Sequence, residues 1–246
     1  MRPPAGAALG ALAIAAAAVV AGAAAGAQQP SPVPRSAARL GVSVEGRPIG
    51  LVRLGDPAAP RKVLVVCCIH GNEGAGQAIV DRLVARRQAP KGTELLLVRD
   101  LNPDGLRHHT RTNAHGVDLN RNSSQMWHRR PGAGEYGGPR PFSEPETRAI
   151  RSLILAERPA IAVWYHQPFG LVDFPETGSS TVSRRYAALT GLPARRLTAE
   201  PGSMSRWENA RVGRGSSFVV ELPGGPLSGR AADRHAAAVL AVARAG

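Results

Sequence analysis

The sequence predicts an α/β domain with three layers, α/β/α, in which helices cover both faces of a mixed, largely parallel central sheet. Four short runs are mostly apolar, which is typical of strands buried on both faces. These runs are residues 63–69, 93–98, 160–165 and 217–220. Stretches with helical periodicity lie between them, and a strand–helix–strand crossover makes the strands that it joins parallel.

The segments around these strands carry turn and hairpin signals. Residues 40–54 alternate between apolar and polar on both sides of the turn at 45–48, which predicts a β-hairpin. The run Asn102-Pro103-Asp104-Gly105 predicts a turn. Residues 107–142 are rich in Gly, Pro, Arg and His and are expected to form a long loop, and loops of this length are usually functional or disordered.

Helices are predicted from apolar periodicity and from capping residues. They are expected at residues 76–88, 143–157, 177–190, 206–211 and 228–245. Ser228 is the expected cap of the last helix. The second helix opens on a capping box in which the Ser143 hydroxyl accepts a hydrogen bond from the Glu146 amide. Glu144 and Glu146 are therefore expected to be structural.

The amino-terminal segment predicts export. Residues 1–27 hold one charge, Arg2, then an Ala/Leu/Val run, and they end in Ala25-Gly26-Ala27, which has the small-x-small form of a signal-peptidase site. An uncleaved membrane anchor is the alternative, because the apolar run exceeds 18 residues. Residues 28–38 are predicted to be a Pro/Ser linker and 39–246 a single domain, which lies outside the cytoplasm on either interpretation.

The chain is strongly basic, and almost all of its positive charge is arginine. The formal net charge of +13 includes Arg2, so residues 28–246 carry +12. Electrostatic association with anionic wall polymers is one interpretation, and an arginine-rich coding composition is the other. Nucleic acid is a poor candidate partner, because aromatic residues make up only 4% of the chain and no binding motif is present.

The two cysteines, Cys67 and Cys68, are adjacent in the sequence. Neighbouring Cα atoms lie about 3.8 Å apart, below the usual disulfide range, and neighbouring side chains of a strand point to opposite faces. We therefore expect no bridge between them. Both are expected to be small buried hydrophobic residues, with a metal-ligand role for Cys68 as the minor alternative.

Three of the apolar strands end in residues that bind metals or transfer protons. His70 and Glu73 follow the first strand, His166 follows the third, and Glu221 follows the fourth. The carboxyl ends of parallel strands meet at one edge of a sheet, where open α/β sheets bind ligands. A closely spaced ligand pair with a distant third ligand leaves one zinc position open, as in catalytic zinc sites. Glu221 is the candidate general base and acid.

The order of several motifs resembles the M14 zinc carboxypeptidase family. The motifs are His70-x-x-Glu73, Asn102-Pro103-Asp104-Gly105, Arg111, the run from Gly116 to Asn122, the run from Pro141 to Thr147, His166 and Glu221. Pro201-Gly202-Ser203, Trp207 and the run from Val219 to Pro223 are most similar to the compact murein peptide amidases of that family. The similarity spans roughly residues 63–223. It implies a single Zn²⁺ ion bound by His70, Glu73 and His166.

The resemblance also implies roles for further residues. Arg111 would face the oxyanion of the tetrahedral intermediate. Asn120 and Arg121 would bind the free carboxylate of the substrate's terminal residue, since a planar guanidinium suits bidentate binding. Asp173 would meet an amine of the substrate, although it is also compatible with a turn. The mobile-loop tyrosine of the digestive members has no counterpart that the sequence can place.

The resemblance implies a zinc metallopeptidase of carboxypeptidase type, and the amino-terminal segment implies that it is secreted. Its expected substrate is a short peptide from peptidoglycan, cut at the γ-D-glutamyl–diaminopimelate bond. An ordinary carboxypeptidase that releases C-terminal residues is the nearest alternative. A metal-free wall-binding module of the same fold is the alternative from another class. The sequence leaves the oligomeric state open.

Overall fold

The computed structural model describes residues 1, 32–129, 134–174, 180–198, 200–212 and 216–244. The predicted signal peptide and the first part of the predicted linker, residues 2–31, lie outside the described residues. No helix in the described ranges combines the length and the apolar character that crossing a membrane requires.

One mixed sheet forms the centre of the domain. The described residues contain eight strands in the order β1-β2-β4-β3-β5-β8-β6-β7. Their bounds are β1 Arg35–Val42, β2 Pro48–Gly55, β3 Arg61–Val66, β4 Thr93–Val98, β5 Ile161–His166, β6 Phe169–Asp173, β7 Ala194–Arg195 and β8 Ser216–Pro223. The four central strands, β4, β3, β5 and β8, are parallel, whereas β1, β2 and β6 pair antiparallel with their neighbours at the two sides. The predicted mixed, largely parallel sheet is therefore confirmed.

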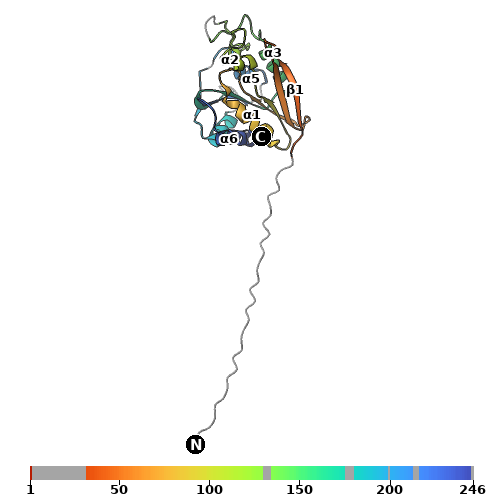
Figure 1. The fold of residues 1–246 in the computed structure, drawn as a ribbon, viewed down its shortest axis with the longest axis vertical. Helices are drawn as coiled ribbons and strands as arrows, with labels where there is room; N and C mark the ends of the chain where they lie inside the picture. The colour runs from red at the N-terminus through yellow and green to blue at the C-terminus, as the bar shows by residue number, and fades with distance from the viewer. Residues whose placement is uncertain (2–31, 130–133, 175–179, 199, 213–215, 245–246) are drawn as a thin grey trace. The chain divides into compact units, whose positions relative to one another are not determined.

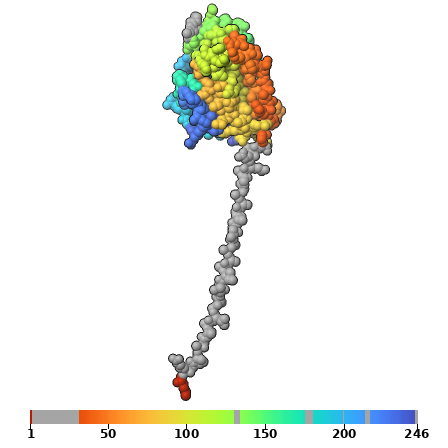
Figure 2. Space-filling view, in the orientation of Figure 1, coloured from red at the N-terminus to blue at the C-terminus, as the bar shows by residue number. Residues whose placement is uncertain are grey.

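Helices pack on both faces of this sheet. The α-helices are α1 Gln77–Arg86, α2 Pro103–His108, α3 Pro145–Glu157, α4 Thr181–Thr190, α5 Met204–Val212 and α6 Gly229–Ala243, and the 3₁₀ turns are η1 Gly74–Gly76 and η2 Leu119–Arg121. Figure 1 shows α1 and α6 in the lower part of the view and α2, α3 and α5 in the upper part. In the space-filling view, the first strands (orange) and the carboxyl-terminal helices (blue) lie on opposite sides (Figure 2).

Side chains that point alternately to the two faces of the central strands produce two apolar cores. Val63 and Val65 of β3 face one core, which α1, α4 and α6 cover. Leu64 and Val66 face the other core, which α3 and α5 cover. Because successive strand residues point to opposite faces, strands that are apolar throughout are needed to fill both layers. This arrangement confirms the three-layer α/β/α prediction.

Several element boundaries differ from the sequence prediction. β1 begins at Arg35, so the last residues of the predicted linker (35–38) belong to the sheet. The run at 102–105 forms the start of helix α2 rather than an isolated turn, and Asn102 caps that helix by accepting a hydrogen bond from the Gly105 amide. The short strands β6 and β7 were not predicted, because their sequences lack the long apolar runs of the central strands.

The first buried strand is shorter than predicted. β3 ends at Val66, and Cys68 has a left-handed backbone with φ of 55°. As a result, both thiols pack in the same core instead of on opposite faces. They are free, as predicted, and burial raises the pKa of each thiol.

The predicted capping box is wrong. Helix α3 has Glu144 at its N-cap without a side-chain capping bond, and the Ser143 hydroxyl donates to the Glu144 carboxylate instead. Glu144 and Glu146 are still structural, because both accept hydrogen bonds from the buried Asn113 amide in the long loop. Ser228 caps α6 as predicted, accepting from the Ala231 amide.

An acidic side chain lies in the second core. Glu208 of α5 is 2% exposed and accepts hydrogen bonds from the Trp164 indole and the Ser217 hydroxyl. Its other carboxylate oxygen has no partner within the described residues. Burial outweighs the two hydrogen bonds and raises the pKa of Glu208 to about 7.

Glu208→Gln should make the domain more stable than the wild type at alkaline pH. Because the folded pKa lies above the unfolded one, the folded state binds this proton more tightly. Wild-type stability is therefore lost as pH rises from about 4.5 through about 7. Between pH 5 and pH 8 the variant should gain on the order of 2 kcal/mol relative to the wild type in urea-unfolding measurements. Glu135→Gln, at a carboxylate that is 56% exposed, should show no such gain.

Candidate active site

The carboxyl edge of the parallel strands holds the predicted metal-binding and catalytic residues. β3, β5 and β8 are neighbours in the sheet, and His166 of β5 pairs in register with Glu221 of β8. His70 and Glu73 follow β3 in the segment that leads into η1. All four side chains are buried. The parallel order therefore brings together residues that are far apart in the chain.

His70, Glu73 and His166 form one cluster in which each residue contacts the other two. The two Glu73 carboxylate oxygens each lie 2.9 Å from a histidine Nδ1, Oε1 from that of His70 and Oε2 from that of His166. The two Nδ1 atoms lie 3.1 Å apart. Burial raises the pKa of Glu73, but the hydrogen bonds and charges of His166 and His70 lower it by more and hold it well below its usual range. The cluster therefore contains an ionised carboxylate.

Close backbone packing sets the conformation of the segment that carries His70. A Cβ atom on Gly71 would lie 1.9 Å from the carbonyl carbon of Gly105 in α2, so only glycine fits there. Asn102 donates from its side chain to the Ile69 carbonyl and from its backbone to the Cys68 carbonyl. The start of α2 therefore fixes the direction in which the chain leaves β3.

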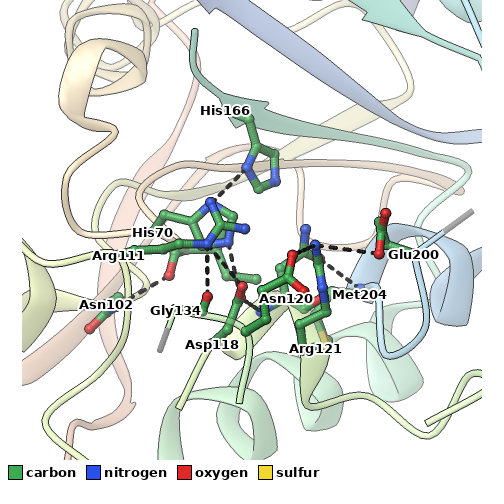
Figure 3. Close-up of polar contacts among 12 residues, drawn as sticks. His70, Asn102, Arg111, Asp118, Asn120, Arg121, Gly134, His166, Glu200 and Met204 are labelled. Carbon is green, nitrogen blue, oxygen red and sulfur yellow. Dashed lines mark hydrogen bonds and ion pairs between the residues drawn. The ribbon is translucent and has the colours of Figure 1, made fainter. Parts of the chain in front are cut away.

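Asp118 is a functional residue that the sequence interpretation did not single out. Its carboxylate is fully buried and lies 3.1 Å from Nε2 of His70, while its other oxygen accepts from Arg111 (Figure 3). Although burial opposes ionisation, His70 and Arg111 hold the pKa of Asp118 well below its usual range. Asp118 belongs to a motif that was noted for Asn120 and Arg121, but nothing in the sequence indicates that it contacts His70.

The Asp118 contact orients His70. A carboxylate only accepts hydrogen bonds, so Nε2 of His70 donates to Asp118. Nδ1 lies 2.9 Å from a Glu73 oxygen, and although burial opposes it, the two carboxylates raise the pKa of His70. A metal cation at the cluster would take the place of the Nδ1 proton.

The cluster fits a zinc ion by the type and spacing of its donor atoms. Two imidazoles and one carboxylate form a known catalytic zinc set. One ligand atom from each residue lies within 4.8 Å of the others. Ligands about 2.1 Å from a tetrahedral ion are roughly 3.4 Å apart, close to the separations in this cluster. His70, Glu73 and His166 could therefore hold one zinc ion with small side-chain adjustments. Cys68 is not part of the cluster; its Sγ contacts the Glu73 carbonyl oxygen at 3.7 Å.

Gln167 is a second residue that sequence reasoning missed. Its backbone amide donates to Oε2 of Glu73, and its side-chain oxygen accepts from the Ala75 amide. Its side-chain nitrogen donates to the carbonyls of Pro223 and Gly225, just beyond Glu221. Gln167 thus joins the segment that carries the first two ligands to the strand that carries Glu221. In the sequence, the position of Gln167 directly after His166 is the only feature that indicates a place near the site.

Glu221 lies beside the cluster with one oxygen available. Its Oε2 is buried and has no hydrogen-bond partner in the described parts of the chain. Burial raises the pKa of Glu221, and the nearby Glu73 carboxylate adds to this effect, while the two histidines oppose it. A buried carboxylate with a free oxygen next to a metal-binding cluster has the properties of a general base.

Arg111 extends toward the same cluster from the long loop. Its Nε donates to Asp118 and to the Gly134 carbonyl, and its Nη1 lies 3.4 Å from Oε1 of Glu73. The side chain is one-third exposed and lines the cavity in front of the cluster. The structure therefore places a positive charge beside the cluster.

Asn120 and Arg121 lie farther along the cavity, on the η2 turn. Figure 3 shows them between Asp118 and Glu200. Arg121 is almost buried, and its Nη2 lies 3.6 Å from both Glu135 and Glu200. Its Nε has no hydrogen-bond partner in the described ranges. The side-chain oxygen Oδ1 of Asn120 accepts from the Met204 amide at the start of α5.

Glycine is needed for the Arg121 backbone to pack closely. Gly202 has φ of 78°, and a Cβ atom there would lie 2.0 Å from the Arg121 carbonyl oxygen. Only glycine combines this left-handed backbone with such a close approach. The Pro201-Gly202-Ser203 motif therefore positions Arg121.

Asp173 lies on strand β6 and not in a turn. One of its oxygens accepts from the Leu197 amide at 2.9 Å, and the other lies 3.8 Å from the Arg206 guanidinium. Both side chains line the cavity. No tyrosine from the described residues lines it, so the structure supplies no counterpart for the mobile-loop tyrosine.

These residues line one cavity of about 720 Å³, which we call the main cleft. The metal-binding cluster and Glu221 line it, and so do Arg121, Asp173 and Arg206. All eight residues predicted for the site line this cleft: His70, Glu73, Arg111, Asn120, Arg121, His166, Asp173 and Glu221.

Comparisons with known proteins identify the family. The family model described as zinc carboxypeptidase matches residues 27–181. Murein peptide amidase A from Escherichia coli strain K12 is 32% identical over 156 residues, which cover 58% of this chain and 63% of that protein, less than two thirds of its length. Murein peptide amidase A from Vibrio campbellii is 31% identical over 183 residues, covering 67% of this chain and 70% of the relative.

Solved structures show the same fold. The crystal structure of murein-tripeptide amidase MpaA from Escherichia coli O157 covers 87% of this chain and 94% of its own, with a TM-score of 0.70 and 26% identity. Carboxypeptidase A from Helicoverpa armigera covers 87% of this chain and 69% of its own, with a TM-score of 0.73 and 18% identity. The family match, the order of the motifs and the geometry of the cluster agree. The chain belongs to the zinc carboxypeptidase family.

Proposed function

We propose that this chain is an exported zinc-dependent amidase that cuts the γ-D-glutamyl–diaminopimelate bond of short peptidoglycan peptides. The observation that carries the proposal is the position of Glu221, whose free carboxylate oxygen lies beside the cluster of His70, Glu73 and His166. The murein peptide amidases among the relatives support the substrate class. The apolar segment at residues 1–27 supports export.

The charged residues that line the main cleft suit the proposed leaving residue. Diaminopimelate carries a carboxylate beside the scissile amide and a second amine–carboxylate pair at the end of its side chain. Besides Arg111, the cleft is lined by two guanidiniums, Arg121 and Arg206, and besides Glu73 and Glu221 it is lined by three carboxylates, Glu135, Asp173 and Glu200. A ligand with charges of both signs complements this lining better than an apolar C-terminal residue does.

The residues of the chain would share the work of the reaction. Zinc held by His70, Glu73 and His166 would supply a water molecule of lowered pKa and would polarise the scissile carbonyl. Glu221 takes a proton from the attacking water and returns it to the leaving amine nitrogen. Arg111 donates to the carbonyl oxygen as negative charge develops on it. Arg121 and Asn120 hold the terminal carboxylate and so orient the amide.

The proposal is tested by comparing three peptides with the purified protein in zinc-containing buffer. L-alanyl-γ-D-glutamyl-diaminopimelate should be cleaved to release diaminopimelate. Peptides with an α-linked C-terminal lysine or phenylalanine should be cleaved much more slowly. Cleavage of the α-linked peptides alone would establish an ordinary carboxypeptidase. No cleavage of any of them, together with no bound zinc, would favour the metal-free binding module. Export is tested separately, by N-terminal sequencing of the exported protein. A mature protein that begins at residue 28 supports a cleaved signal peptide, whereas one that begins at Met1 supports an anchor.

Asp118→Asn should weaken zinc binding without removing a ligand. Asparagine keeps the shape but loses the charge that orients His70 through Nε2. Loss of such an outer carboxylate typically costs 10–100-fold in metal affinity, and we expect a loss in that range. Competition with a chelator measures it. Asp104→Asn is the matched control, because Asp104 is an equally buried aspartate that contacts Ser43 and Arg47 instead. Equal zinc affinities in wild type and Asp118→Asn would contradict this role.

Glu221→Gln should abolish most of the activity while zinc stays bound. Removing a general base typically lowers the rate about 10²–10⁴-fold, and the amide keeps the size of the side chain. We expect kcat to fall in that range with one zinc ion per chain retained, as measured by steady-state kinetics and metal analysis. A variant with wild-type kcat would show that another group accepts the proton.

A further inference from the structure

Two exposed arginines lie over one phenylalanine ring just after strand β6. The guanidinium carbon of Arg184 in α4 lies 4.3 Å from the centroid of the Phe174 ring, and that of Arg196, directly after β7, lies 5.3 Å from the same centroid. Both distances fall within the range of cation–π contacts, about 6 Å. We call these three side chains the Phe174 patch. The fold thus holds two positive charges on one small area of the surface.

The positive charge of this patch has no carboxylate beside it to neutralise it. Among the residues that the structure describes, no ion pair joins Arg184 or Arg196 to a carboxylate. Residues 180–198, which include α4 and β7, contain four arginines and no aspartate or glutamate. Helix α6 packs against α4 and carries one acidic residue, Asp233, which is paired with two arginines of α1. An anion from outside the chain would therefore meet little competition at the patch.

The Phe174 patch borders the main cleft without forming part of it. Asp173 directly precedes Phe174, and Leu197 directly follows Arg196. Asp173 and Leu197 both line the cleft, whereas the patch side chains do not. The Asp173 carboxylate accepts from the Leu197 amide at 2.9 Å and lies 3.8 Å from the Arg206 guanidinium, so it is already engaged on the cleft side. A ligand on the patch would lie next to the cleft and leave it open to substrate.

The arrangement of the two guanidiniums indicates which anion suits them. An arginine that lies over a ring still presents the N–H groups at the edge of its guanidinium. A carboxylate is planar, and one guanidinium can bind both of its oxygens. The oxygens of a phosphate group are arranged as a tetrahedron, so a phosphate can accept from two guanidiniums in different planes. We propose that the Phe174 patch binds an anionic polymer whose repeating charges are phosphate groups, and that this binding keeps the main cleft beside the polymer.

A polymer suits the patch better than a lipid surface does. Phe174 is partly buried and lies beneath both guanidiniums, so its ring is not free to enter a membrane. A polymer offers several phosphates at once, and each arginine that neutralises one of them releases counterions. A neighbouring phosphate can also take the place of one that dissociates, because the chain keeps it nearby.

The test measures how tightly the purified full chain binds long-chain inorganic polyphosphate over a range of salt concentrations. The wild type should bind. Arg184→Gln combined with Arg196→Gln should weaken binding about tenfold at moderate salt, and the slope of log Kd against log salt should fall by about two, one for each lost phosphate contact. Each single variant should lose about half of this slope, which decides the matter if the double variant fails to fold.

A matched variant separates the patch from net charge. Arg39→Gln combined with Arg151→Gln removes the same charge from β1 and α3, and β1 lies at the opposite edge of the sheet from β7. Arg151 also lies over an aromatic ring, 5.0 Å from the centroid of Phe142. This control should keep the wild-type affinity and salt slope. Equal weakening by the two double variants would show that only net charge acts and would overturn the patch assignment.

Two further probes identify the anion. Polyglutamate offers carboxylates along a polymer, and vesicles of equal parts phosphatidylglycerol and phosphatidylcholine offer phosphates on a lipid surface. The protein should bind polyphosphate more tightly than either of them. Tighter binding to polyglutamate or to the vesicles would overturn the proposal, and so would an absence of polyphosphate binding at low salt. Peptide cleavage is measured separately, because the patch arginines do not line the main cleft and both double variants should cleave at the wild-type rate. Loss of the proposed function would therefore leave the patch assignment intact.

Discussion

The site depends on one electrostatic arrangement, in which the ionised carboxylate of Glu73 contacts two buried histidines. Each oxygen lies 2.9 Å from one imidazole nitrogen, so movement of either strand end would break a charged contact in a buried environment. Asp118 places a second carboxylate on the far side of His70 and orients its ring. The negative charge around the histidines thus prepares the cluster to receive a cation.

The sheet provides the rigidity that this arrangement requires. β3, β5 and β8 are parallel neighbours, buried on both faces by separate helical layers, and their carboxyl ends cannot shift independently. The functional segments between them are irregular, but buried polar contacts hold them. Asn102 fixes the chain after β3, Gln167 bridges the ends of β5 and β8, and Gly202 lets Arg121 pack closely. The core therefore orders the main cleft even where regular structure ends.

Charge is distributed unevenly over this framework. The chain is strongly basic, yet the main cleft mixes arginines with carboxylates. Net charge thus says little about what binds in the main cleft. Recognition depends on individual pairs, such as Arg121 between Glu135 and Glu200 or Arg206 beside Asp173. These pairs join residues that are distant in the sequence, and only folding brings them together.

The sequence by itself determined the layered α/β fold and the residues that meet at the sheet edge. Buried strands need unbroken apolar runs, and a chain with four such runs, each followed by a turn or polar residue, has few ways to fold. The tertiary structure decided the features that the apolar periodicity of the sequence does not encode. Examples are the early end of β3, the failure of the Ser143 capping box, the short strands β6 and β7, and the partners of His70 and Gln167. Each of these depends on contacts between residues far apart in the chain. Local sequence patterns such as periodicity do not report the energies of those contacts.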